Sequence, residues 1–551
     1  MPQSTPSLAA THEVFNQPPP LADYNLLASD RALQEAVRRE GADWAVTELS
    51  DLGARLGRQE TIECGFAANT NPPVLRAFDR YGNRRDEVVF HPAYHEMLGL
   101  AVAAGLHSSP WAVPRPGAHV ARAAGFYMLT QIESGVCCPI AMTYGSVPTL
   151  RRETSLALEW LPRISSRHYD RRFRPAAEKT GALLGMGMTE KQGGSDLRAN
   201  TTRAVPSAEG GGSYRLTGHK WFLSAPMCDA FLVLAQAPKG PSCFLLPRWT
   251  PDGALNGLRL QRLKDKLGNR SNASSEVELV EAWGMPIGEE GRGIPIIIEM
   301  SNLTRLDCAI GSAGLMRQAV AQALHHARHR TAFQKHLVDQ PLMANVLADI
   351  ALEAEAATAL ALRLARAYDG GEGGEEAALR RLITPVAKYW ICKRGPSLAV
   401  EAMEALGGNG YVEESMMPRL YREMPVNSVW EGSANIICLD VRRAMTREPG
   451  AVDAFLAEIG KARGGNFRLD RFLVTLETDL RGAQQEPEGL ARRMVGRMAV
   501  ALEAALLVQH SPSTLADAFC ASRLENEAGG AFGTLPGGVN TRAIVERASA
   551  R

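Results

Sequence analysis

The sequence predicts a mainly α-helical protein that is interrupted by one central β domain. Apolar residues recur at helical spacing in residues 1–182 and again in residues 289–445. Between these two regions, in residues 183–288, short β-branched and aromatic runs alternate with Gly-rich turns. A fourth section, residues 446–551, has helical periodicity of its own. We therefore expect an N-terminal arm with a helical domain, a small β-barrel, a four-helix bundle and an extra C-terminal helical domain.

The first 182 residues begin with an arm and continue as helices. Residues 1–20 are polar and end in three prolines, which predicts an extended segment laid on another domain or subunit. Ser29 and Asp30 can cap the helix that follows. From Asn25 to about Thr180 the pattern is mostly helical, and prolines between residues 110 and 116 divide it into helix-loop segments.

Residues 183–288 read as several short strands. Alternating or apolar runs are separated by turns such as residues 209–212 and 251–253. The runs are Ser213–Thr217, Phe231–Ala235, Cys243–Leu246, Leu258–Leu260 and Glu276–Val280. Strands of this length and spacing are typical of a β-barrel or sandwich.

The bundle is expected from long amphipathic helices. Pro341 suits the first position of one of them, and Asp369–Gly374 makes a hairpin loop. Pro385 and Pro396 predict kinks or helix ends. Antiparallel helices joined by short loops form a bundle. The Gly-rich tail from about Ala528 is expected to be loose.

Composition excludes several classes of function. The formal net charge of +1 provides no global field for nucleic acid or anionic membrane. Residues 451–551 hold as many basic as acidic residues. The nine cysteines lack disulfide-type spacing, so reduced thiols in the cytoplasm are expected. The N-terminus lacks a signal-peptide pattern, and no run of about 18 apolar residues predicts a membrane span.

Residues Val429–Asn435 carry the sharpest chemical pattern. Glu431 stands between an indole and Gly432, so its carboxylate can be desolvated, which raises its pKa and makes it a better base near neutral pH. Ser433 and Asn435 offer hydrogen-bonding groups to a polar ligand. The alternative is a helix N-terminus with an acidic first turn.

Two further motifs lie in the β domain. Residues 188–196 combine two glycines with hydroxyls, which allows close backbone approach to a planar or phosphorylated ligand; the same residues could form an ordinary turn. In residues 218–224, Phe222 and Ser224 lie two apart on a strand and face the same side. They could cover a flat ring and bond its edge, or belong to a half-buried strand.

Residues 330–335 and 406–411 resemble a helix end and a Gly-rich turn. Walker A, GxSxG and dinucleotide-binding patterns are missing from the sequence. His325, His326 and His329 share one helix, but adjacent histidines point to different faces, so we expect no metal site.

Taken in order, these motifs resemble the acyl-CoA dehydrogenase superfamily of flavoproteins over roughly residues 80–445. The stretches MTEKQGGSD, GHKWF, RLKDKLGNRSNAS, LGGNGYVEES and PRLYREMPVNSVWEGSANI are similar to its AidB-type branch, which is associated with the adaptive response to alkylation. VFNQPPPL and the section after residue 445 also resemble that branch.

The resemblance implies FAD as the cofactor and a homotetramer as the assembly. It places the flavin ring edge and pyrophosphate at the first motif, a flavin-face aromatic at Phe222 and a hydroxyl at the reactive ring nitrogen at Ser224. Arg330 and Phe333, with residues 404–408, match positions that touch the cofactor of a neighbouring subunit. The implied cofactor-binding residues are Met188, Thr189, Gly194, Ser195, Phe222, Ser224, Arg330, Phe333, Glu404, Gly407, Gly408, Trp430, Gly432, Ser433 and Asn435.

The resemblance also implies the chemistry. Glu431 matches the catalytic base that removes a proton next to a thioester carbonyl, while the flavin accepts a hydride from the next carbon. Some members place the base in the first bundle helix, where this chain has Thr304. Arg305 matches an arginine near the CoA portion, with a structural salt bridge as the alternative.

Proteins of this branch resemble dehydrogenases that bind double-stranded DNA and protect it, with weak activity on acyl-CoA of the isovaleryl type. Arg443 lies where the branch has an arginine connected with DNA contact, and Arg442, Arg447, Arg463, Arg468 and Arg471 could extend a basic patch. The alternatives are a working acyl-CoA dehydrogenase without a DNA role, and destruction of a small alkylating compound.

Overall fold

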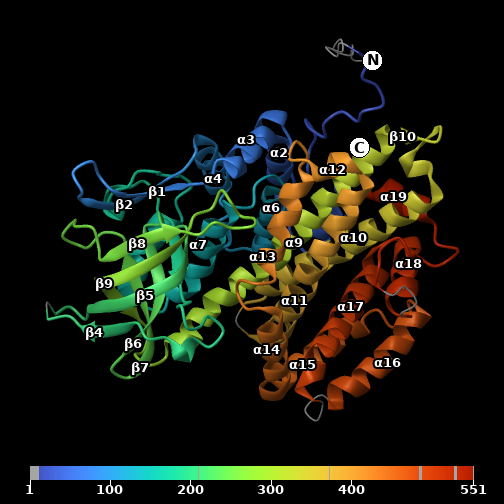
Figure 1. The fold of residues 1–551 in the computed structure, drawn as a ribbon. Coiled ribbons are helices and arrows are strands. Elements are labelled where there is room, and N and C mark those ends of the chain that lie inside the picture. The colour runs from blue at the N-terminus through green and yellow to red at the C-terminus, as the bar shows by residue number, and fades with distance from the viewer. Residues whose placement is uncertain (1–10, 209, 372, 483–486, 526–529, 550–551) are drawn as a thin grey trace.

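The structure is a computed structural model that describes residues 11–208, 210–371, 373–482, 487–525 and 530–549. Helical regions precede and follow a β-barrel, and the barrel lies at one side of the molecule (Figure 1). The predicted fold class is confirmed. Buried hydrophobic side chains form one continuous cluster through all of these parts. No helix in the described ranges is long and apolar enough to cross a membrane.

Helices and one hairpin make up the N-terminal part. Asp30 caps the first helix by accepting a hydrogen bond from the Leu33 N–H, as predicted. The elements are α1 (Arg31–Arg39), α2 (Val46–Leu56), α3 (Gln59–Thr70), β1 (Val74–Phe78), β2 (Arg84–Val89), α4 (Pro92–Ala103), α5 (Ser109–Ala112), α6 (Ala118–Ile132), α7 (Cys137–Leu150) and α8 (Thr154–Ile164). The β1–β2 hairpin was not predicted. Its turn is held by Asp79, which accepts hydrogen bonds from the Tyr81 and Asn83 N–H groups.

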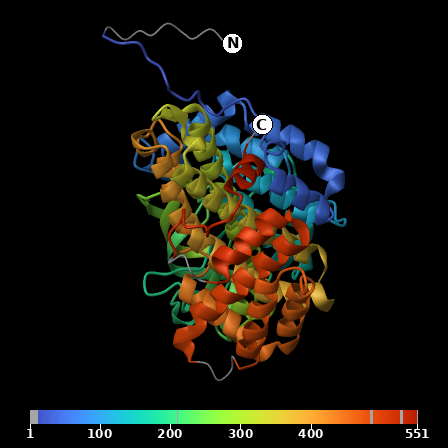
Figure 2. The same cartoon turned by 90° about the vertical axis from the view of Figure 1, so that its right-hand side faces the viewer.

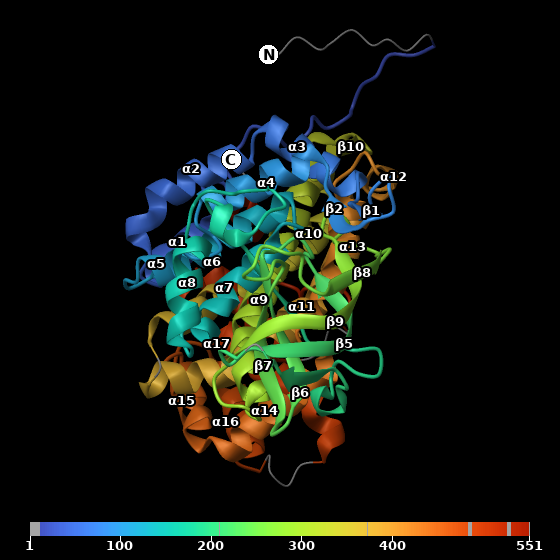
Figure 3. The same ribbon diagram turned by 90° about the vertical axis from the view of Figure 1, so that its left-hand side faces the viewer.

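The central domain is a closed barrel with two additional strands (Figure 3). Its strands are β3 (Leu184–Gly187), β4 (Arg203–Pro206), β5 (Tyr214–Ser224), β6 (Ala230–Ala237), β7 (Gly240–Pro247), β8 (Leu258–Leu263) and β9 (Ser274–Ile287). The ring runs β6-β4-β5-β9-β7 and returns to β6, while β3 pairs with β6 and β8 pairs with β9. Closure leaves few unpaired edges, so β5 is held firmly where the site motifs lie.

Long helices form the bundle beside the barrel. They are α9 (Gly293–His329), α10 (Pro341–Asp369), α11 (Gly374–Ala405), α13 (Met417–Asn427) and α14 (Ala434–Arg447), with the short α12 (Gly408–Tyr411) and the hairpin β10 (Thr331–Ala332) and β11 (Lys335–His336) at one end. Pro341 starts α10 as predicted. Of the two alternatives predicted for Pro385 and Pro396, kinks or helix ends, the structure excludes helix ends, because α11 continues through both.

The C-terminal section packs along the outer side of the bundle (Figure 2). It contains α15 (Pro449–Gly460), α16 (Phe467–Gly482), α17 (Ala491–His510), α18 (Ser513–Arg523) and α19 (Thr541–Ala548). Buried charges join it to the bundle: Arg363 of α10 pairs with Glu458 of α15 at 2.5 Å, and the Trp390 indole of α11 donates to Glu503 of α17 at 3.0 Å.

The expectation of a loose tail was wrong for the described residues after 529. Asp349 of α10 accepts a hydrogen bond from the Gly533 N–H at 2.9 Å, and Asn345 accepts one from the Leu535 N–H at 3.1 Å. Arg547 of α19 pairs with the buried Glu355 of α10 at 2.8 Å. The glycines therefore give the tail a path along α10 instead of freeing it.

Candidate functional site

Glu431 occupies a strained turn between α13 and α14. Its φ is 58°, in the left-handed region that non-glycine residues rarely enter, and Gly432 follows with a φ of 102°. Lys388 of α11 holds this turn by donating a hydrogen bond to the Gly432 carbonyl. Such strain persists only where the surroundings impose the conformation, and it is concentrated at functional sites.

The carboxyl group of Glu431 points to the first bundle helix. Thr304 of α9 donates a hydrogen bond to it at 2.7 Å. Burial raises the pKa of Glu431, against the opposing effects of this hydrogen bond and of Arg305 and Lys388. The two positions that the sequence resemblance implies for the base, Thr304 and Glu431, are therefore in direct contact in the fold.

Arg305 stabilises the turn by a hydrogen bond to its backbone. Its guanidinium donates to the Glu431 carbonyl at 2.9 Å and pairs with Asp440 of α14 at 2.9 Å. Of the two interpretations drawn from the sequence, this geometry favours the structural salt bridge. Arg305 fixes the backbone that carries the carboxylate.

Phe222 and Ser224 project from β5 as the period of two requires. The Phe222 ring is 47% exposed, although phenylalanine is normally buried. The Ser224 hydroxyl lies 3.1 Å from the Ser274 hydroxyl of β9. An exposed aromatic ring beside an inward hydroxyl forms a surface for a flat ligand with a polar edge.

Cys138, at the start of α7, is a buried thiol that both halves of the site influence. Burial raises its pKa to about 12, so the thiol stays protonated. Glu431 also raises this pKa and Ser224 lowers it, so the Glu431 turn and the β5 motif, 207 residues apart in the sequence, both act on the same thiol.

Residues 188–196 form a loop against β5. The Thr189 carbonyl accepts a hydrogen bond from the Trp221 N–H at 2.8 Å, and the Met188 carbonyl accepts one from Asn200 at 2.8 Å. Gly194 lies so close to Thr189 that a Cβ there would come within 2.8 Å of the threonine hydroxyl. Ser195 is exposed at the rim of this loop. Around Gly194 and Ser195 the loop offers N–H and hydroxyl groups with only small side chains.

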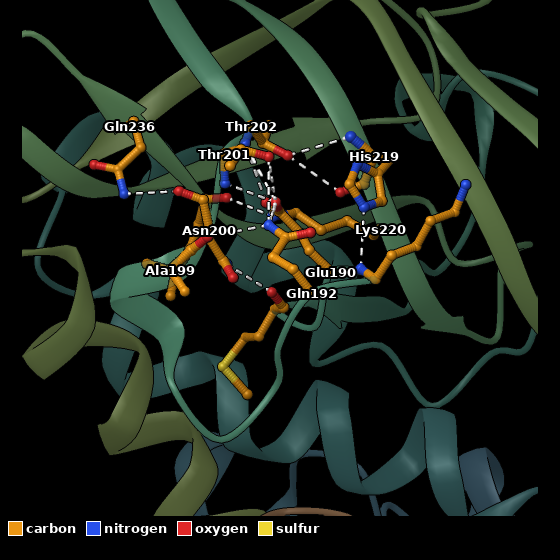
Figure 4. A network of polar contacts seen from close by, with 12 residues as sticks. Glu190, Gln192, Ala199, Asn200, Thr201, Thr202, His219, Lys220 and Gln236 are labelled. Carbon is orange, nitrogen blue, oxygen red and sulfur yellow. Dashed lines mark hydrogen bonds and ion pairs between the residues drawn. The ribbon is translucent and has the colours of Figure 1, made fainter.

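An ion pair that was not predicted from the sequence joins the loop 188–196 to the β5 motif. Glu190 and Lys220 are both fully buried, and the carboxylate and ammonium lie 2.7 Å apart. Glu190 also accepts hydrogen bonds from the Thr201 and Thr202 N–H groups, and Lys220 donates to the Leu234 carbonyl (Figure 4). The only signal for this pair in the sequence was an acidic residue in the first motif and a basic residue in the second. The pair sets the loop at a fixed position relative to β5.

Trp430, Ser433 and Asn435 flank the Glu431 turn. The Trp430 indole donates to Asn427 at 3.0 Å, which holds the ring beside the turn. Ser433 is exposed and is the N-cap residue of α14, next to the first N–H groups of the helix, which have no partner within the helix. The Asn435 side chain accepts a hydrogen bond from Arg492 of α17 at 2.8 Å, so the C-terminal section reaches this edge of the site.

The other predicted cofactor residues lie at the far end of the bundle. Arg330 follows the last residue of α9, 26 residues after Thr304, which is about 39 Å along the helix at 1.5 Å per residue. Phe333 is 92% exposed. Glu404, Gly407 and Gly408 are exposed near α12. The chain itself does not bring this second group to the Glu431 turn.

The N-terminal arm ties the second group together. Arg330 donates to the Asn16 carbonyl at 2.7 Å, and Asn409 donates to the Gln17 side chain at 3.2 Å. His325 donates to the Pro19 carbonyl at 2.7 Å. Residues 11–20 thus lie on another part of the same chain, while residues 1–10 are outside the described ranges.

The basic patch expected from the sequence is smaller in the structure. Arg443 is exposed on α14, with Asp440 3.9 Å away. Arg468 and Arg471 both pair with Glu525 at 2.7 Å, and Arg463 pairs with Glu477. Those three guanidinium groups are partly neutralised, which leaves Arg443 and the exposed Arg447 as the stronger candidates for phosphate contact.

Comparisons with known proteins cover nearly the whole chain. Residues 16–171 match the adaptive response protein AidB N-terminal domain, residues 185–282 the acyl-CoA dehydrogenase middle domain and residues 291–446 the acyl-CoA dehydrogenase C-terminal domain. The chain is 47% identical to AidB of Escherichia coli (strain K12), over 94% of this chain and 95% of that protein.

A second relative extends the likeness to structure. Acyl-CoA dehydrogenase family member 11 of Caenorhabditis elegans is 29% identical over 88% of this chain and 83% of its own length. The crystal structure of Caenorhabditis elegans ACDH-11 in complex with C11-CoA superposes with a TM-score of 0.85, at 28% identity, covering 94% of each chain.

Proposed function

The chain belongs to the acyl-CoA dehydrogenase family, in its AidB branch, and from that premise we propose that its site oxidises an acyl-CoA thioester with Glu431 as the catalytic base. The family identification confirms the predicted class of reaction, an oxidoreductase acting on the CH–CH bond of acyl-CoA, and the predicted cofactor, FAD. The observation that carries the assignment of the base is the half-buried Glu431 carboxyl on a strained turn, with a pKa that burial raises.

The residues present fit FAD. The loop 188–196 has no side chain at Gly194, it is bonded to β5 next to the exposed Phe222, and the Ser224 hydroxyl follows two residues later on the same strand. In the proposed site Thr189 and Ser195 bind the ring edge and pyrophosphate, and Phe222 covers the ring. When bound, the flavin supplies a hydride acceptor.

Glu431 takes the proton from the carbon next to the thioester carbonyl. Its raised pKa makes the carboxylate a stronger base, and Thr304 orients it through the 2.7 Å hydrogen bond. Arg305 and Lys388 hold the turn by donating to backbone carbonyls, and their charges lower the pKa of Glu431 without outweighing the effect of burial. We propose short branched acyl-CoA of the isovaleryl type as the substrate, with low turnover.

Glu431→Gln tests the base directly. Anaerobic addition of isovaleryl-CoA to the yellow protein should bleach the flavin of the wild type, and Glu431→Gln should slow bleaching by at least about 100-fold with FAD still bound. Glu48→Gln is the matched control, since it removes an exposed carboxylate from α2, outside both groups of predicted site residues. Unchanged bleaching in Glu431→Gln would remove it as the base, and a wild-type flavin that no acyl-CoA reduces would exclude dehydrogenation.

We also propose a homotetramer in which the second residue group completes a neighbour's cofactor site. The support is the separation of about 39 Å within one chain and the exposure of large apolar residues beside that group. They are Phe333, Leu342, Tyr411 and Val412. Phe333→Asp should both lower the oligomeric mass in light scattering and weaken FAD binding. Retention of both properties would separate this group from the cofactor.

A second candidate function is binding and protection of double-stranded DNA during alkylation stress. It is favoured by the 47% identity to AidB and by exposed arginines on the outer face, namely Arg443 and Arg447 of α14 and Arg492 and Arg493 of α17. Duplex binding should weaken steeply with salt, and Arg443→Ala should lower the salt slope by about one phosphate contact. Arg542→Ala, on the exposed side of α19, is the matched control. Failure of the wild type to shift duplex at low salt would exclude this function.

The third alternative is destruction of a small alkylating compound by the flavin. The test compares turnover of a methylating agent by the protein with and without bound FAD. Turnover that does not require FAD would exclude this alternative. We propose a cytoplasmic location, because all nine cysteines are free thiols.

A further inference from the structure

The β10–β11 hairpin presents Phe333 on a strained turn at the far end of the bundle (Figure 1). The two turn residues, Phe333 and Gln334, have φ values of 51° and 65°, in the left-handed region where hairpin turns normally use asparagine or glycine. The Phe333 ring is 92% exposed, so its burial within the chain does not offset this strain. Each strand has only two residues, and so short a hairpin is marginally stable by itself. Neighbouring groups must therefore hold it.

Asn16 of the N-terminal arm supplies this support through its side chain. Its amide nitrogen donates to the Thr331 carbonyl at 2.9 Å, and its amide oxygen accepts hydrogen bonds from the Thr331 N–H and hydroxyl, both at 2.8 Å. A backbone N–H only donates and a carbonyl only accepts, so the orientation of the Asn16 amide is fixed. Asn16 thus covers the outer edge of β10 as a neighbouring strand would.

The same residue orients Arg330. The Arg330 guanidinium donates from Nη1 to the backbone carbonyl of Asn16 at 2.7 Å. This bond uses one of the five N–H donors of the guanidinium and restricts the rotation of a long side chain. Asn16 has a φ of 56°, which asparagine tolerates better than most residues. In this conformation its carbonyl and its side chain bond two consecutive residues, Arg330 and Thr331.

The bundle itself sets the position of the arm. His325 of α9 donates a hydrogen bond to the Pro19 carbonyl at 2.7 Å, and Asn409 of α12 donates one to the Gln17 side chain at 3.2 Å. These contacts lie one and three residues after Asn16. The arm therefore connects α9, α12 and the hairpin, which together carry the second group of predicted cofactor residues.

We propose that Asn16 is a positioning residue: it holds Arg330 and the strained hairpin in the conformation in which they complete the cofactor site of a neighbouring subunit. This inference rests on the proposed function, because it needs bound FAD and the second residue group at a neighbour's site. Groups held in place before the ligand arrives lose less conformational freedom on binding, which raises affinity. A hairpin that is competent for only about a tenth of the time would bind FAD about tenfold more weakly.

Asn16→Gly tests this role, because glycine adopts the left-handed φ and the change removes only the side-chain hydrogen bonds. Titration of the full-length apoprotein with FAD should give a dissociation constant at least about tenfold above that of the wild type. Light scattering at saturating FAD should give the wild-type oligomeric mass, because the contacting groups are all retained. Glu13→Ala is the matched control at an exposed position of the same arm, and it should stay within about twofold of the wild type.

Two further measurements separate positioning from a general loosening of the fold. Arg330→Ala removes the guanidinium that Asn16 orients, so in the double variant with Asn16→Gly the two losses of affinity should combine to less than their product. Hydrogen exchange in the apoprotein should become faster in residues 330–337 of Asn16→Gly, while the middle of α9 stays as protected as in the wild type.

The outcomes distinguish this inference from the function on which it rests. A wild type that binds no FAD would overturn the proposed site as a whole. If neither Arg330→Ala nor Phe333→Asp weakens FAD binding, the second group does not touch the cofactor and the inference falls with it. If those variants weaken binding but Asn16→Gly does not, or if the two losses multiply fully, the role of Asn16 alone is overturned.

Thr331→Val keeps the test decisive if Asn16→Gly does not fold, as judged by circular dichroism. It removes the hydroxyl that bonds the Asn16 amide oxygen and leaves the arm unchanged. Loss of this one hydrogen bond should weaken FAD binding about fivefold. An unchanged dissociation constant in Thr331→Val would overturn the inference.

Discussion

Removing Lys220 should show how strongly one buried ion pair holds the two proposed flavin motifs together. Lys220→Met keeps the length of the side chain but takes away its charge. Glu190 would then be left fully buried, with no cation at 2.7 Å. Loss of one partner from a buried pair typically costs about 3–5 kcal/mol, which is a large part of the roughly 5–15 kcal/mol that stabilises a domain.

The hydrogen bonds that Glu190 keeps in Lys220→Met limit the loss of stability. Glu190 keeps hydrogen bonds from the Thr201 N–H at 2.7 Å and the Thr202 N–H at 3.2 Å, so the carboxylate is not stripped of all partners. We therefore expect a loss near the lower end, about 3 kcal/mol. Chemical denaturation at pH 7 measures it, and FAD affinity should fall in parallel because the loop 188–196 loses its anchor on β5.

The pH dependence gives an internal check with a definite sign. In the wild type burial opposes ionisation, but Lys220 and the hydrogen bonds outweigh it and lower the pKa of Glu190 from 4.5 to about 2. The pair therefore stabilises the fold above about pH 4.5, and this contribution is lost as pH falls towards 2. In Lys220→Met the pKa of Glu190 should rise above 4.5, so the difference from wild type should shrink as pH falls.

The double variant decides whether the ion pair is the cause. Glu190→Gln retains an oxygen for the Thr201 and Thr202 N–H groups, so Glu190→Gln with Lys220→Met should be more stable than Lys220→Met alone, by about 1–3 kcal/mol. A Lys220→Met variant within about 1 kcal/mol of wild type, or a double variant in which the two costs add, would refute the reasoning.

Three further changes have defined outcomes. Thr304→Val removes the hydrogen bond that lowers the pKa of Glu431, so the acid limb of the pH–rate profile should move to higher pH; a limb that stays in place would contradict that assignment. Burial raises the pKa of Glu423 from 4.5 to about 7. The folded state then binds the extra proton, so wild-type stability should fall as pH rises from about 4.5 to 7, by at most about 3 kcal/mol. Glu423→Gln should flatten that slope in urea titrations, and an unaltered slope would point to another group. Asp349→Ala should speed hydrogen exchange in residues 530–548 while leaving α9 protected. Equal exchange rates of residues 530–548 in the wild type and in Asp349→Ala would show that the tail does not depend on Asp349.

Local patterns in the sequence predict much of this protein. The periodicities of 3.6 and 2 separate helical from β regions because a packed helix or strand must bury one face. Asp30 and Pro341 mark helix starts because capping and a missing N–H act within one turn. The order of the motifs indicates the family, and with it the fold class, the reaction and FAD. The assignment of individual residues to the cofactor stays a prediction.

Only the tertiary structure decides which distant groups become neighbours. Thr304 reaches Glu431 across 127 residues, and Arg492 reaches Asn435 across 57. No short-range pattern encodes such pairs, because they depend on how α9, α14 and α17 pack. Asp349 lies 184 residues before Gly533, yet it captures a tail whose glycines predict looseness. The sequence by itself determined the elements and the chemical groups. Packing between elements determined which charges are buried and which groups hold the base.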